Sequence, residues 1–342
     1  MKILVLMGGD SPERDVSLVS GAAIAEGLKQ AGHQVLAVDT ADSWKALTLK
    51  SESLPKGIKT EPPPINQLER LDSVRALKSF ESSDLKDIEV IFLALHGGKG
   101  EDGTIQALLD LTGKPYTGSG VLASALAMNK HMSKKIFQRE GILTPRWSFW
   151  DGRDSSDWTG LTASAQKIGY PLVVKPNNQG STVGVSIVDE PSQLPRAMEL
   201  AQDYSRQIII EEFIPGREIT VAVLDYDPLP VVEIVPEHGI YDYECKYTPG
   251  KSRYICPAQL TQKQTKEVQE AGLKAFQALS CQGYARVDFR MSKEGRFYCL
   301  EVNTLPGMTQ HSLVPKAAQT AGISFSKLVE RIVELAVTKR SS

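Results

Sequence analysis

The chain has 342 residues, a length that predicts two or three domains rather than one hydrophobic core. Its apolar content of 41%, charged content of 23% and net charge of −2 are ordinary for a soluble globular protein and give no basic surface for nucleic acid. No apolar run is long enough to span a bilayer, and the short apolar start is unlike a signal peptide. The four cysteines lack CxxC spacing, which is typical of a reduced chain. We therefore expect a cytoplasmic protein with no nucleic-acid or membrane partner.

The N-terminal region, 1–120, has the pattern of an α/β domain. Its first two apolar runs flank a segment with helical spacing, and this β–α–β unit predicts a parallel sheet. Segment 41–87 carries little signal. Strands are predicted over 3–7, 33–39, 88–95 and 114–117, and helices over 16–32 and 104–111.

Two glycine-rich loops follow strands in this region: GGDSPERDVS at 8–17 and HGGKGEDGTIQ at 96–106. Neither loop is a dinucleotide fingerprint, but binding sites form at the carboxyl ends of parallel strands. Glu13 and His96 are therefore site candidates. A glutamate in a first helical turn also favours the helix dipole, and a lone histidine is more often structural.

The middle region, 121–210, predicts one helix over 122–141, whose lysines we expect mainly on a solvated face. Strands follow at 144–150 and 171–176, and the second ends near Lys175. The sequence NNQGSTVGVSIV, at 177–188, is a loop of small residues whose backbone N–H groups can approach phosphates. It lacks the Gly-Lys-Ser/Thr of a P-loop.

The last region, 211–342, includes two strands within 207–225 that turn at Pro215-Gly216. Segment 237–258 is long, polar and aromatic, which is typical of a lid or a disordered loop. Amphipathic helices for packing are predicted over 261–280 and 326–339.

The segment 286–303 predicts a β-hairpin with a turn at Glu294-Gly295. In this register Asp288 lies opposite Glu301, and Arg286 faces Asn303. Two carboxylates opposite each other repel unless a cation lies between them. Carboxylate and amide oxygens suit Mg²⁺ that also holds a nucleotide's phosphates, although a shift of one residue would remove the arrangement.

The tail of this hairpin extends the pattern to D…E-x-N-T-x-P-G-M-T-x-x-S-L-x-P, at 288–315. It resembles the ATP-grasp ligases, and the D-alanine–D-alanine ligase family in particular. The glycine-rich loops match that family too, as GG-x-S-x-E-x-x-V-S, HG-x-x-G-E-D-G and G-S-T-V-G-V-S, so six motifs in order cover nearly the whole chain. The resemblance implies an N-terminal parallel-sheet, Rossmann-like α/β substrate domain (1–120) before a two-lobed ATP-grasp α+β module. The module would comprise a central lobe with the glycine-rich loop (121–210) and a C-terminal lobe with the metal site and an omega loop (211–342).

The resemblance also implies residues that act on the amino-acid substrates. Glu13 would hold the ammonium group of the first D-alanine in a hydrogen-bonded network with Ser181 and Tyr247. Arg286 and the Gly307 backbone N–H would stabilise the developing negative charge, and both count with that network as catalytic. The implied D-alanine contacts are Glu13, His96, Arg286, Gly307, Ser312 and Leu313.

A nucleotide and metal site is implied in the two later lobes. Segment 211–214 would be the adenine hinge and Glu218 the ribose ligand, while Ile187 replaces a lysine that many members have and removes one loop contact. The implied ATP contacts are Lys130, Lys175, Ser181, Glu211, Glu212, Phe213, Ile214, Glu218, Lys246 and Asn303. The implied ligands of two Mg²⁺ or Mn²⁺ ions are Asp288, Glu301 and Asn303.

The implied function is ATP-dependent ligation of two D-alanine molecules through an acyl phosphate, for peptidoglycan synthesis, by a homodimer. D-lactate or D-serine as second substrate is one alternative, and Tyr247 argues against lactate. Another ATP-grasp ligase joining a different carboxylate and amine is a second. A nucleotide-binding protein without turnover is a third, but intact Arg286 and the three metal ligands speak against it.

Overall fold

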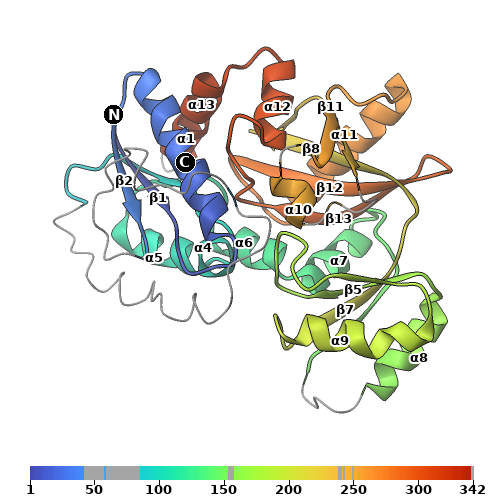
Figure 1. Ribbon diagram of the computed structural model, residues 1–342. Helices are drawn as coiled ribbons and strands as arrows, with labels where there is room; N and C mark the ends of the chain where they lie inside the picture. Colours follow the sequence, from blue (N-terminus) through green and yellow to red (C-terminus); the bar gives the residue numbers. More distant parts are fainter. Residues whose placement is uncertain are drawn as a thin grey trace.

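The computed structural model describes residues 1–41, 58, 85–152, 158–237, 241, 243–248 and 250–339. Three sheets organise these residues, one in each of three parts of the molecule (Figure 1). Among the described helices, none combines the length and apolar character that a bilayer-spanning segment needs. The predicted α/β fold class is confirmed by this mixture of a parallel sheet, two antiparallel sheets and covering helices.

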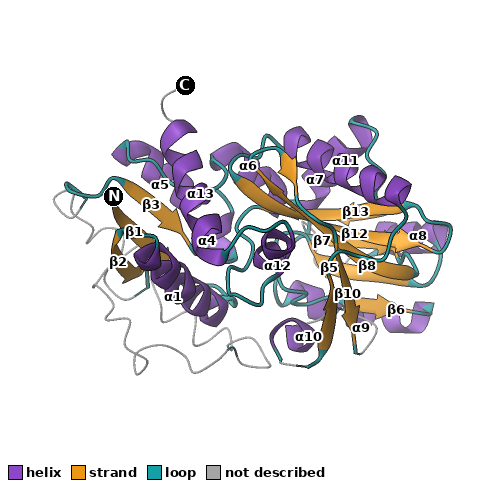
Figure 2. Cartoon of the chain, turned by 90° about the horizontal axis from the view of Figure 1, so that it is seen from above, coloured by secondary structure: helices purple, strands orange, loops and turns teal. Residues whose placement is uncertain are grey.

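The N-terminal sheet is parallel, with strand order β2-β1-β3, as the β–α–β pattern predicts. Alternate residues of β1 point into different cores, since Val5 joins one apolar cluster and Leu6 another. Helices α1 and α13 lie side by side on the first cluster, and α5 covers the second (Figures 1 and 2). The elements are β1 (Lys2–Met7), α1 (Arg14–Gln30), β2 (Gln34–Asp39), β3 (Val90–Leu93), α4 (Gly98–Glu101), α5 (Thr104–Thr112) and α13 (Phe325–Lys339).

Two predictions near this sheet are wrong in detail. The strand expected over 114–117 is a single bridge between Tyr116 and Ile91. Pro115 has no N–H to continue a ladder, and the chain turns at Gly118 (φ 84°). The single helix expected over 122–141 is two helices, α6 (Val121–Met128) and α7 (Lys130–Arg139), because Asn129 leaves the helical conformation and its side chain accepts a hydrogen bond from the backbone N–H of Met132 at 3.1 Å.

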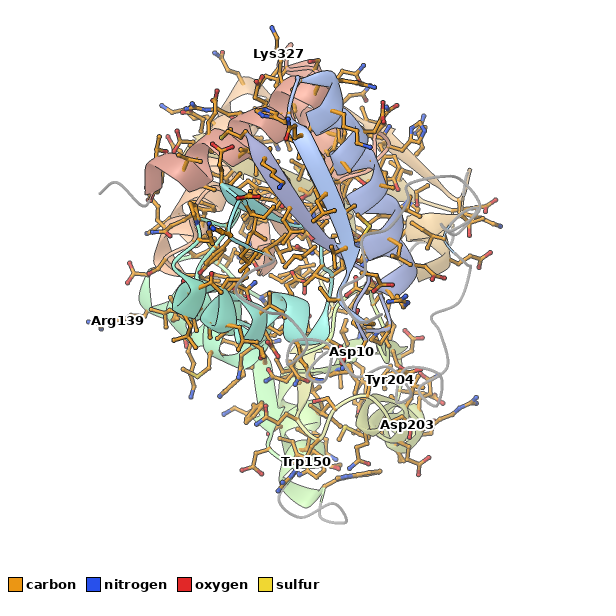
Figure 3. All side chains as sticks on the ribbon, turned by 90° about the vertical axis from the view of Figure 1, so that its left-hand side faces the viewer. Asp10, Arg139, Trp150, Asp203, Tyr204 and Lys327 are labelled. Carbon is orange, nitrogen blue, oxygen red and sulfur yellow. The ribbon has the colours of Figure 1, made fainter. Side chains whose placement is uncertain are left out.

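The central sheet has the order β4-β7-β5-β6, and each pair of neighbours is antiparallel. Helices α8 and α9 pack on one face over a separate apolar cluster. Trp150, at the end of β4, and Lys327, in α13, lie at opposite ends of the molecule (Figure 3). The elements are β4 (Trp147–Trp150), α8 (Thr159–Ile168), β5 (Leu172–Pro176), β6 (Ser186–Val188), η1 (Pro191–Gln193), α9 (Leu194–Gln202) and β7 (Ile208–Glu212).

The C-terminal sheet has the order β11-β10-β8-β12-β13, with β9 paired to β8. Helix α11 packs on one face of it, and α12 is part of the cluster on the other. A capping box at Thr261 starts α11 at the predicted place. The elements are β8 (Gly216–Leu224), β9 (Asp227–Pro228), β10 (Val232–Pro236), α10 (Tyr243–Tyr247), β11 (Ser252–Ile255), α11 (Gln262–Ala278), β12 (Tyr284–Ser292), β13 (Phe297–Asn303) and α12 (Leu313–Thr320).

The segment 237–258 is more regular than predicted. Its described residues include helix α10 and strand β11, and β11 pairs with the edge strand β10. Edge strands leave backbone groups unpaired, so the returning chain gains hydrogen bonds there despite its polar sequence. Residues 238–240, 242 and 249 lie outside the described part of this segment.

The β12–β13 hairpin has a bulge that sets the register of the site. On the turn side of the bulge, Phe289 lies opposite Cys299; beyond it the pairing shifts by one residue, so that Asp288 lies opposite Glu301. Without the shift, Asp288 would face Leu300, and the two carboxylates would lie on opposite faces of the sheet. The predicted pairs are confirmed: Asp288 with Glu301, and Arg286 with Asn303.

Candidate functional site

A cavity of about 550 Å³ lies where the three parts of the fold meet. Its wall combines the first loop after β1, the glycine-rich loop after β5, helix α10 and the β12–β13 hairpin. Segments far apart in the sequence therefore share one concave site, which is the usual form of a small-molecule site. The predicted site residues that line it are Glu13, His96, Lys130, Ser181, Lys246, Arg286, Glu301, Asn303, Gly307, Ser312 and Leu313.

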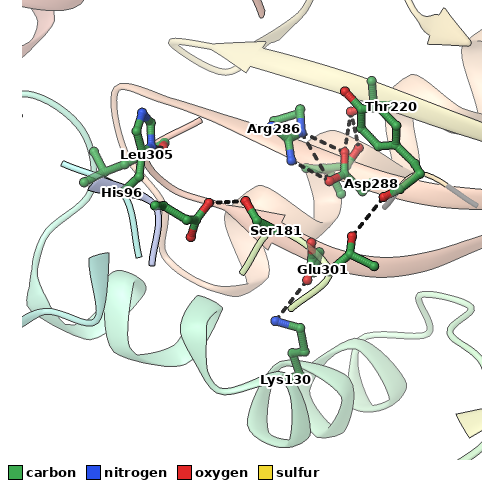
Figure 4. A network of polar contacts seen from close by, with 12 residues as sticks. His96, Lys130, Ser181, Thr220, Arg286, Asp288, Glu301 and Leu305 are labelled. Atoms are coloured by element: carbon green, nitrogen blue, oxygen red, sulfur yellow. Dashed lines mark hydrogen bonds and ion pairs between the residues drawn. The ribbon is translucent and has the colours of Figure 1, made fainter. Parts of the chain in front are cut away.

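The two facing carboxylates of the hairpin pair with different basic side chains (Figure 4). Arg286 Nε and Nη2 donate to Asp288 at 2.9 and 2.8 Å, and Lys130 Nζ lies 3.0 Å from Glu301 Oε2. Thr220 Oγ1 also donates to Asp288 Oδ1, at 2.6 Å. Burial alone would raise the pKa of Glu301, but Lys130 and the other nearby lysines outweigh it and lower the pKa to about 2. Glu301 thus stays ionised, and each carboxylate has its own basic partner, which reduces the repulsion between the two.

The side chain of Asn303 completes this group. Within the described part of the chain, no group donates a hydrogen bond to its buried Oδ1 atom. Buried polar atoms are normally satisfied, so this oxygen has capacity for a ligand. No cluster of three His, Cys, Asp or Glu side chains with the arrangement of a metal site occurs among the described residues. The donor set here is two carboxylates and one amide, which are hard oxygens that fit Mg²⁺ or Mn²⁺ bound with phosphates.

Glu13 and Ser181 join the N-terminal loop to the glycine-rich loop. Ser181 Oγ donates a short hydrogen bond to Glu13 Oε1 across 168 positions of sequence. A Cβ atom on Gly180 would lie 2.5 Å from Glu13 Oε2, so only glycine allows this approach. Thr182, which like Ser181 has a positive φ, donates from Oγ1 to the Tyr241 carbonyl at 2.9 Å. The glycine-rich loop therefore contacts both the loop after β1 and the segment before α10.

His96 is held from both ring nitrogens. Its Nδ1 lies 2.7 Å from the Leu305 carbonyl and its Nε2 lies 3.2 Å from Ser20 Oγ. Ser20 Oγ in turn accepts from the Met308 backbone N–H at 3.3 Å. Burial lowers the pKa of His96, which favours the neutral ring with Nδ1 donating to the carbonyl. The geometry supports a role in holding the 305–308 loop against α1.

Glu101 is a buried carboxyl that the sequence reasoning did not single out. It accepts from the Gly97 N–H at 3.0 Å. Burial and the charge of Glu13 raise its pKa to about 7. The only signal for it was its position in the H-G-x-x-G-E-D-G loop.

Lys134 corrects the expectation of a solvated lysine face on 122–141. Its side chain is 0% exposed, and its Nζ lies 2.8 Å from Glu211 Oε2. Lys175 Nζ lies 2.5 Å from the other oxygen, Glu211 Oε1. Burial alone would raise the pKa of Glu211, but the two lysines outweigh it and lower the pKa. The signal was the i, i+4 spacing of Lys130 and Lys134, which puts both on one helix face.

The predicted nucleotide-base segment lies outside the lining of the cavity. Glu212 pairs with Arg146 at 3.0 Å on the exposed side of the sheet, so its side chain points away from the site and only its backbone remains for a base. Glu218 lies 3.4 Å from Arg290, whose guanidinium is 5.6 Å from the centre of the Phe213 ring. Burial raises the pKa of Glu218 to about 7. Glu218 lies opposite Arg290 of the hairpin because β8 pairs directly with β12.

The remaining predicted residues lie on two helices. Ser312 precedes α12, and its Oγ accepts from the Thr309 N–H at 3.0 Å, while Leu313 begins the helix. Lys246, on α10, has its Nζ 5.2 Å from the centre of the Tyr241 ring, and burial lowers the pKa of Lys246. Tyr247 ends α10, and its side chain lies outside the described part of the structure.

Comparison with known proteins places both halves of the chain in one group. The family model described as D-ala D-ala ligase N-terminus matches residues 2–119, and the model described as D-ala D-ala ligase C-terminus matches residues 136–334. The chain is 43% identical over 340 residues to the D-alanine–D-alanine ligase of Synechococcus sp. (strain JA-2-3B'a(2-13)), covering 99% of this chain and 94% of that protein. It is 44% identical over 335 residues to the enzyme of the same name from Gloeobacter violaceus, covering 98% and 99%.

Solved structures are similar over the same length. The D-alanine–D-alanine ligase of Bacillus anthracis complexed with ATP matches with a TM-score of 0.76 and 34% identity, covering 100% of this chain and 99% of that one. The VanG D-Ala:D-Ser ligase of Enterococcus faecalis matches with a TM-score of 0.80 and 30% identity, covering 98% and 99%. These likenesses confirm the predicted ATP-grasp architecture.

Proposed function

Because this chain belongs to the D-alanine–D-alanine ligase family, we propose that it joins two D-alanine molecules into D-alanyl-D-alanine and converts ATP into ADP and phosphate. The observation that carries the proposal is the bulged hairpin, which puts Asp288 opposite Glu301 and whose Glu301 and Asn303 line the cavity. The product would serve peptidoglycan synthesis in the cytoplasm.

The charges around the hairpin support binding of a triphosphate. Six basic side chains lie among four carboxylates there, an excess that favours binding of an anion. The basic side chains are Lys130, Lys134, Lys175, Lys246, Arg286 and Arg290, and the carboxylates are Glu211, Glu218, Asp288 and Glu301. Asp288, Glu301 and Asn303 would hold the two Mg²⁺ or Mn²⁺ ions, which when bound would neutralise phosphate charge.

The nucleotide itself would extend from the hairpin toward β7. The backbone of 211–214 would bind the base, and Glu218 would accept hydrogen bonds from the ribose hydroxyls. The Arg290–Glu218 pair and the Phe213 ring beside it support this placement, since they form a partly apolar wall with one carboxyl.

The chemistry we propose has two transfers. A carboxylate oxygen of the first D-alanine attacks the γ-phosphorus of ATP, and ADP leaves. The amine of the second D-alanine then attacks the acyl carbon, loses a proton and expels phosphate. Negative charge collects on the carbonyl oxygen, where the Arg286 guanidinium and the Gly307 backbone N–H would stabilise it. Substrates that fill the cavity would limit the access of water and so the hydrolysis of the acyl phosphate.

The two amino acids need different partners. We propose that Glu13 binds the ammonium group of the first D-alanine, with its orientation set by Ser181 and with Tyr247 completing the network. Ser312 and the Leu313 N–H, at the start of α12, would bind the carboxylate of the second. A helix N-terminus favours an anion, which supports that assignment. His96 would keep the 305–308 loop in position for both.

We also propose a homodimer that forms through α5 and α6. These helices contact each other and carry four of the exposed large apolar side chains. Leu111 is 86% exposed and Leu122 is 64% exposed, which is a large apolar exposure for two contacting helices of a monomer. The other two are Leu108 and Val121. We propose that each subunit of this dimer has three domains, which comprise residues 1–120, 121–210 and 211–342.

The function is tested by phosphate release from ATP with purified protein. We expect release with D-alanine and Mg²⁺, and formation of the dipeptide by mass spectrometry, but no release with L-alanine. Addition of D-serine or D-lactate as second substrate tests the alternative that the likeness to a D-Ala:D-Ser ligase raises. Failure to release phosphate with D-alanine and any of these partners would refute the proposal.

A further inference from the structure

A buried ionic cluster lies behind the proposed phosphate site. Lys134 on α7, Lys175 on β5 and Glu211 on β7 form it, with side chains 0%, 9% and 4% exposed. Lys134 Nζ lies 2.8 Å from Glu211 Oε2, and Lys175 Nζ lies 2.5 Å from Glu211 Oε1. Each oxygen of one carboxylate therefore has its own cation. The proposed ligation chemistry requires only Lys175 of these two lysines.

The two lysines differ in their freedom to change partner. Lys134 also donates to Thr144 Oγ1 at 2.7 Å, and Thr144 donates to the Cys299 carbonyl at 2.8 Å. Its amino group lies 5.7 Å from the centre of the Trp147 ring, so it is enclosed on several sides. The side chain of Lys175 is 9% exposed, against 0% for that of Lys134, so the amino group of Lys175 is the more accessible of the two. Lys175 is thus the one placed to reach a phosphate.

If Lys175 binds a phosphate, Glu211 loses one of its two cationic partners. If Lys175 were its only cation, Glu211 would be left as a buried, unpaired carboxylate when the phosphates arrived. Such a charge is strongly unfavourable in a protein interior. Glu211 would then compete with ATP for Lys175 and weaken nucleotide binding.

We propose that Lys134 is a positioning residue for ATP binding: it keeps Glu211 neutralised, so that Lys175 is shared with or released to the phosphates. This inference rests on the proposed use of ATP. Lys134 itself contacts no nucleotide in this scheme and acts through Glu211 and Lys175. Both amino groups lie within ion-pair distance of the one carboxylate. When both lysines are protonated, an incoming anion balances the extra positive charge.

The test is the affinity for Mg²⁺ and ATP without D-alanine, measured by isothermal titration calorimetry on the full-length protein. We expect Lys134→Met to weaken ATP binding by about tenfold or more, because the remaining pair holds Lys175. Lys135→Met is the matched control, since Lys135 is exposed on the same helix, and should bind ATP as the wild type does. Adenosine, which has no phosphate, should bind equally well to the wild type and Lys134→Met.

A rescue separates this role from a merely structural one. In a Glu211→Gln background nothing competes for Lys175, so adding Lys134→Met should change ATP affinity by less than about threefold. This comparison remains valid if Lys134→Met alone fails to fold, which thermal unfolding will show. Each of three results would overturn the proposal. The wild type and Lys134→Met could bind ATP equally well, or Lys134→Met could lose as much affinity for adenosine as for ATP. The third is a large loss of ATP affinity when Lys134→Met is added to Glu211→Gln. A wild-type protein that binds no ATP would instead refute the proposed function.

Discussion

Asp288 and Glu301 lie directly opposite each other on β12 and β13, yet Asp288 binds Arg286 and Glu301 binds Lys130. Two like charges in that position normally destabilise a ladder. Here the separate basic partners offset the repulsion, and Glu301 lines the cavity. The pair is therefore stable before any ligand is present.

Replacing one of these carboxylates should abolish most of the activity. We expect Glu301→Gln to lower phosphate release by at least about 100-fold and to raise the Mg²⁺ concentration needed for half-maximal rate, because a hard anionic ligand is lost. Glu294→Gln, at the exposed turn of the same hairpin, is the control and should behave as the wild type. An unchanged Mg²⁺ dependence in Glu301→Gln would contradict the assignment of this residue.

Substitutions of Arg286 should distinguish the effect of its positive charge from the effect of its two-pronged hydrogen bonding. Its guanidinium binds both oxygens of Asp288, which a lysine cannot do. We expect Arg286→Met to lower kcat by about 10²–10³-fold, as measured by initial rates at saturating ATP and D-alanine. The kcat of Arg286→Lys should lie between that of Arg286→Met and that of the wild type. Arg296→Lys on the same hairpin is exposed and serves as control. A change confined to KM would argue against stabilisation of the transition state.

The Ser181–Glu13 hydrogen bond should matter for D-alanine more than for ATP binding. Removing the hydroxyl in Ser181→Ala frees the carboxylate that would hold the ammonium group, and a bond to a charged group contributes about 2 kcal/mol. We expect the KM for D-alanine to rise by roughly tenfold or more in steady-state assays. Ser192→Ala, on the surface of the same lobe, should leave it unaltered. If only the KM for ATP rose, the proposed role of this bond would be wrong.

Glu101 predicts a specific pH dependence of stability. Its folded pKa of about 7 lies above the ordinary value of 4.5, so the native state binds the proton more tightly than the unfolded chain. Its contribution to the free energy of unfolding is therefore greatest below about pH 4.5, falls as the pH rises toward 7, and levels off above that. The fall has an upper bound of about 3 kcal/mol.

Urea denaturation at several pH values checks this. The difference in stability between the wild type and Glu101→Gln should change over that range, with the variant gaining relative stability as the pH rises. Glu140→Gln is the control, because Glu140 is exposed. Parallel curves for the wild type and Glu101→Gln would show that the carboxyl of Glu101 does not titrate as described.

The proposed homodimer is tested at the apolar surface of α5 and α6. We expect Leu111→Glu with Leu122→Glu to give a monomer by light scattering coupled to size-exclusion chromatography, because charges would enter an apolar interface. Leu200→Glu is the control, since Leu200 is 41% exposed but lies on α9 in another lobe. A wild-type protein that is monomeric at micromolar concentration, or a doubly substituted protein that stays dimeric, would exclude this surface.

The hairpin could be predicted because strand alternation and the E-x-N motif both fix which side chains share a face. The bulge that produces the register could not, since β13 gives no local sign that it carries one extra residue. The predicted pairing of Asp288 with Glu301 is right, but the one-residue shift in register that produces this pairing was not predicted. The first β–α–β unit was predictable for a similar reason, as continuous apolar runs indicate strands buried on both faces.

Lys134 and Glu212 show where sequence reasoning reached its limit. A lysine in an amphipathic helix is usually solvated, and only a buried partner far along the chain, Glu211, makes Lys134 an interior residue. Glu212 belongs to the matched motif, yet strand alternation turns its side chain to the exposed side, toward Arg146. Both outcomes depend on tertiary neighbours that no local pattern contains.

The end of β7 at Glu212 and the start of β8 at Gly216 belong to two different sheets, joined by residues 213–215 alone. Residues 213 and 214 of this link also belong to the segment that would bind the nucleotide base. Any rotation of the central lobe against the larger sheet must bend the chain there, so a ligand seated on it would restrain that rotation. A small molecule directed to this link could therefore arrest the protein in one orientation of its lobes, without competing for either amino acid.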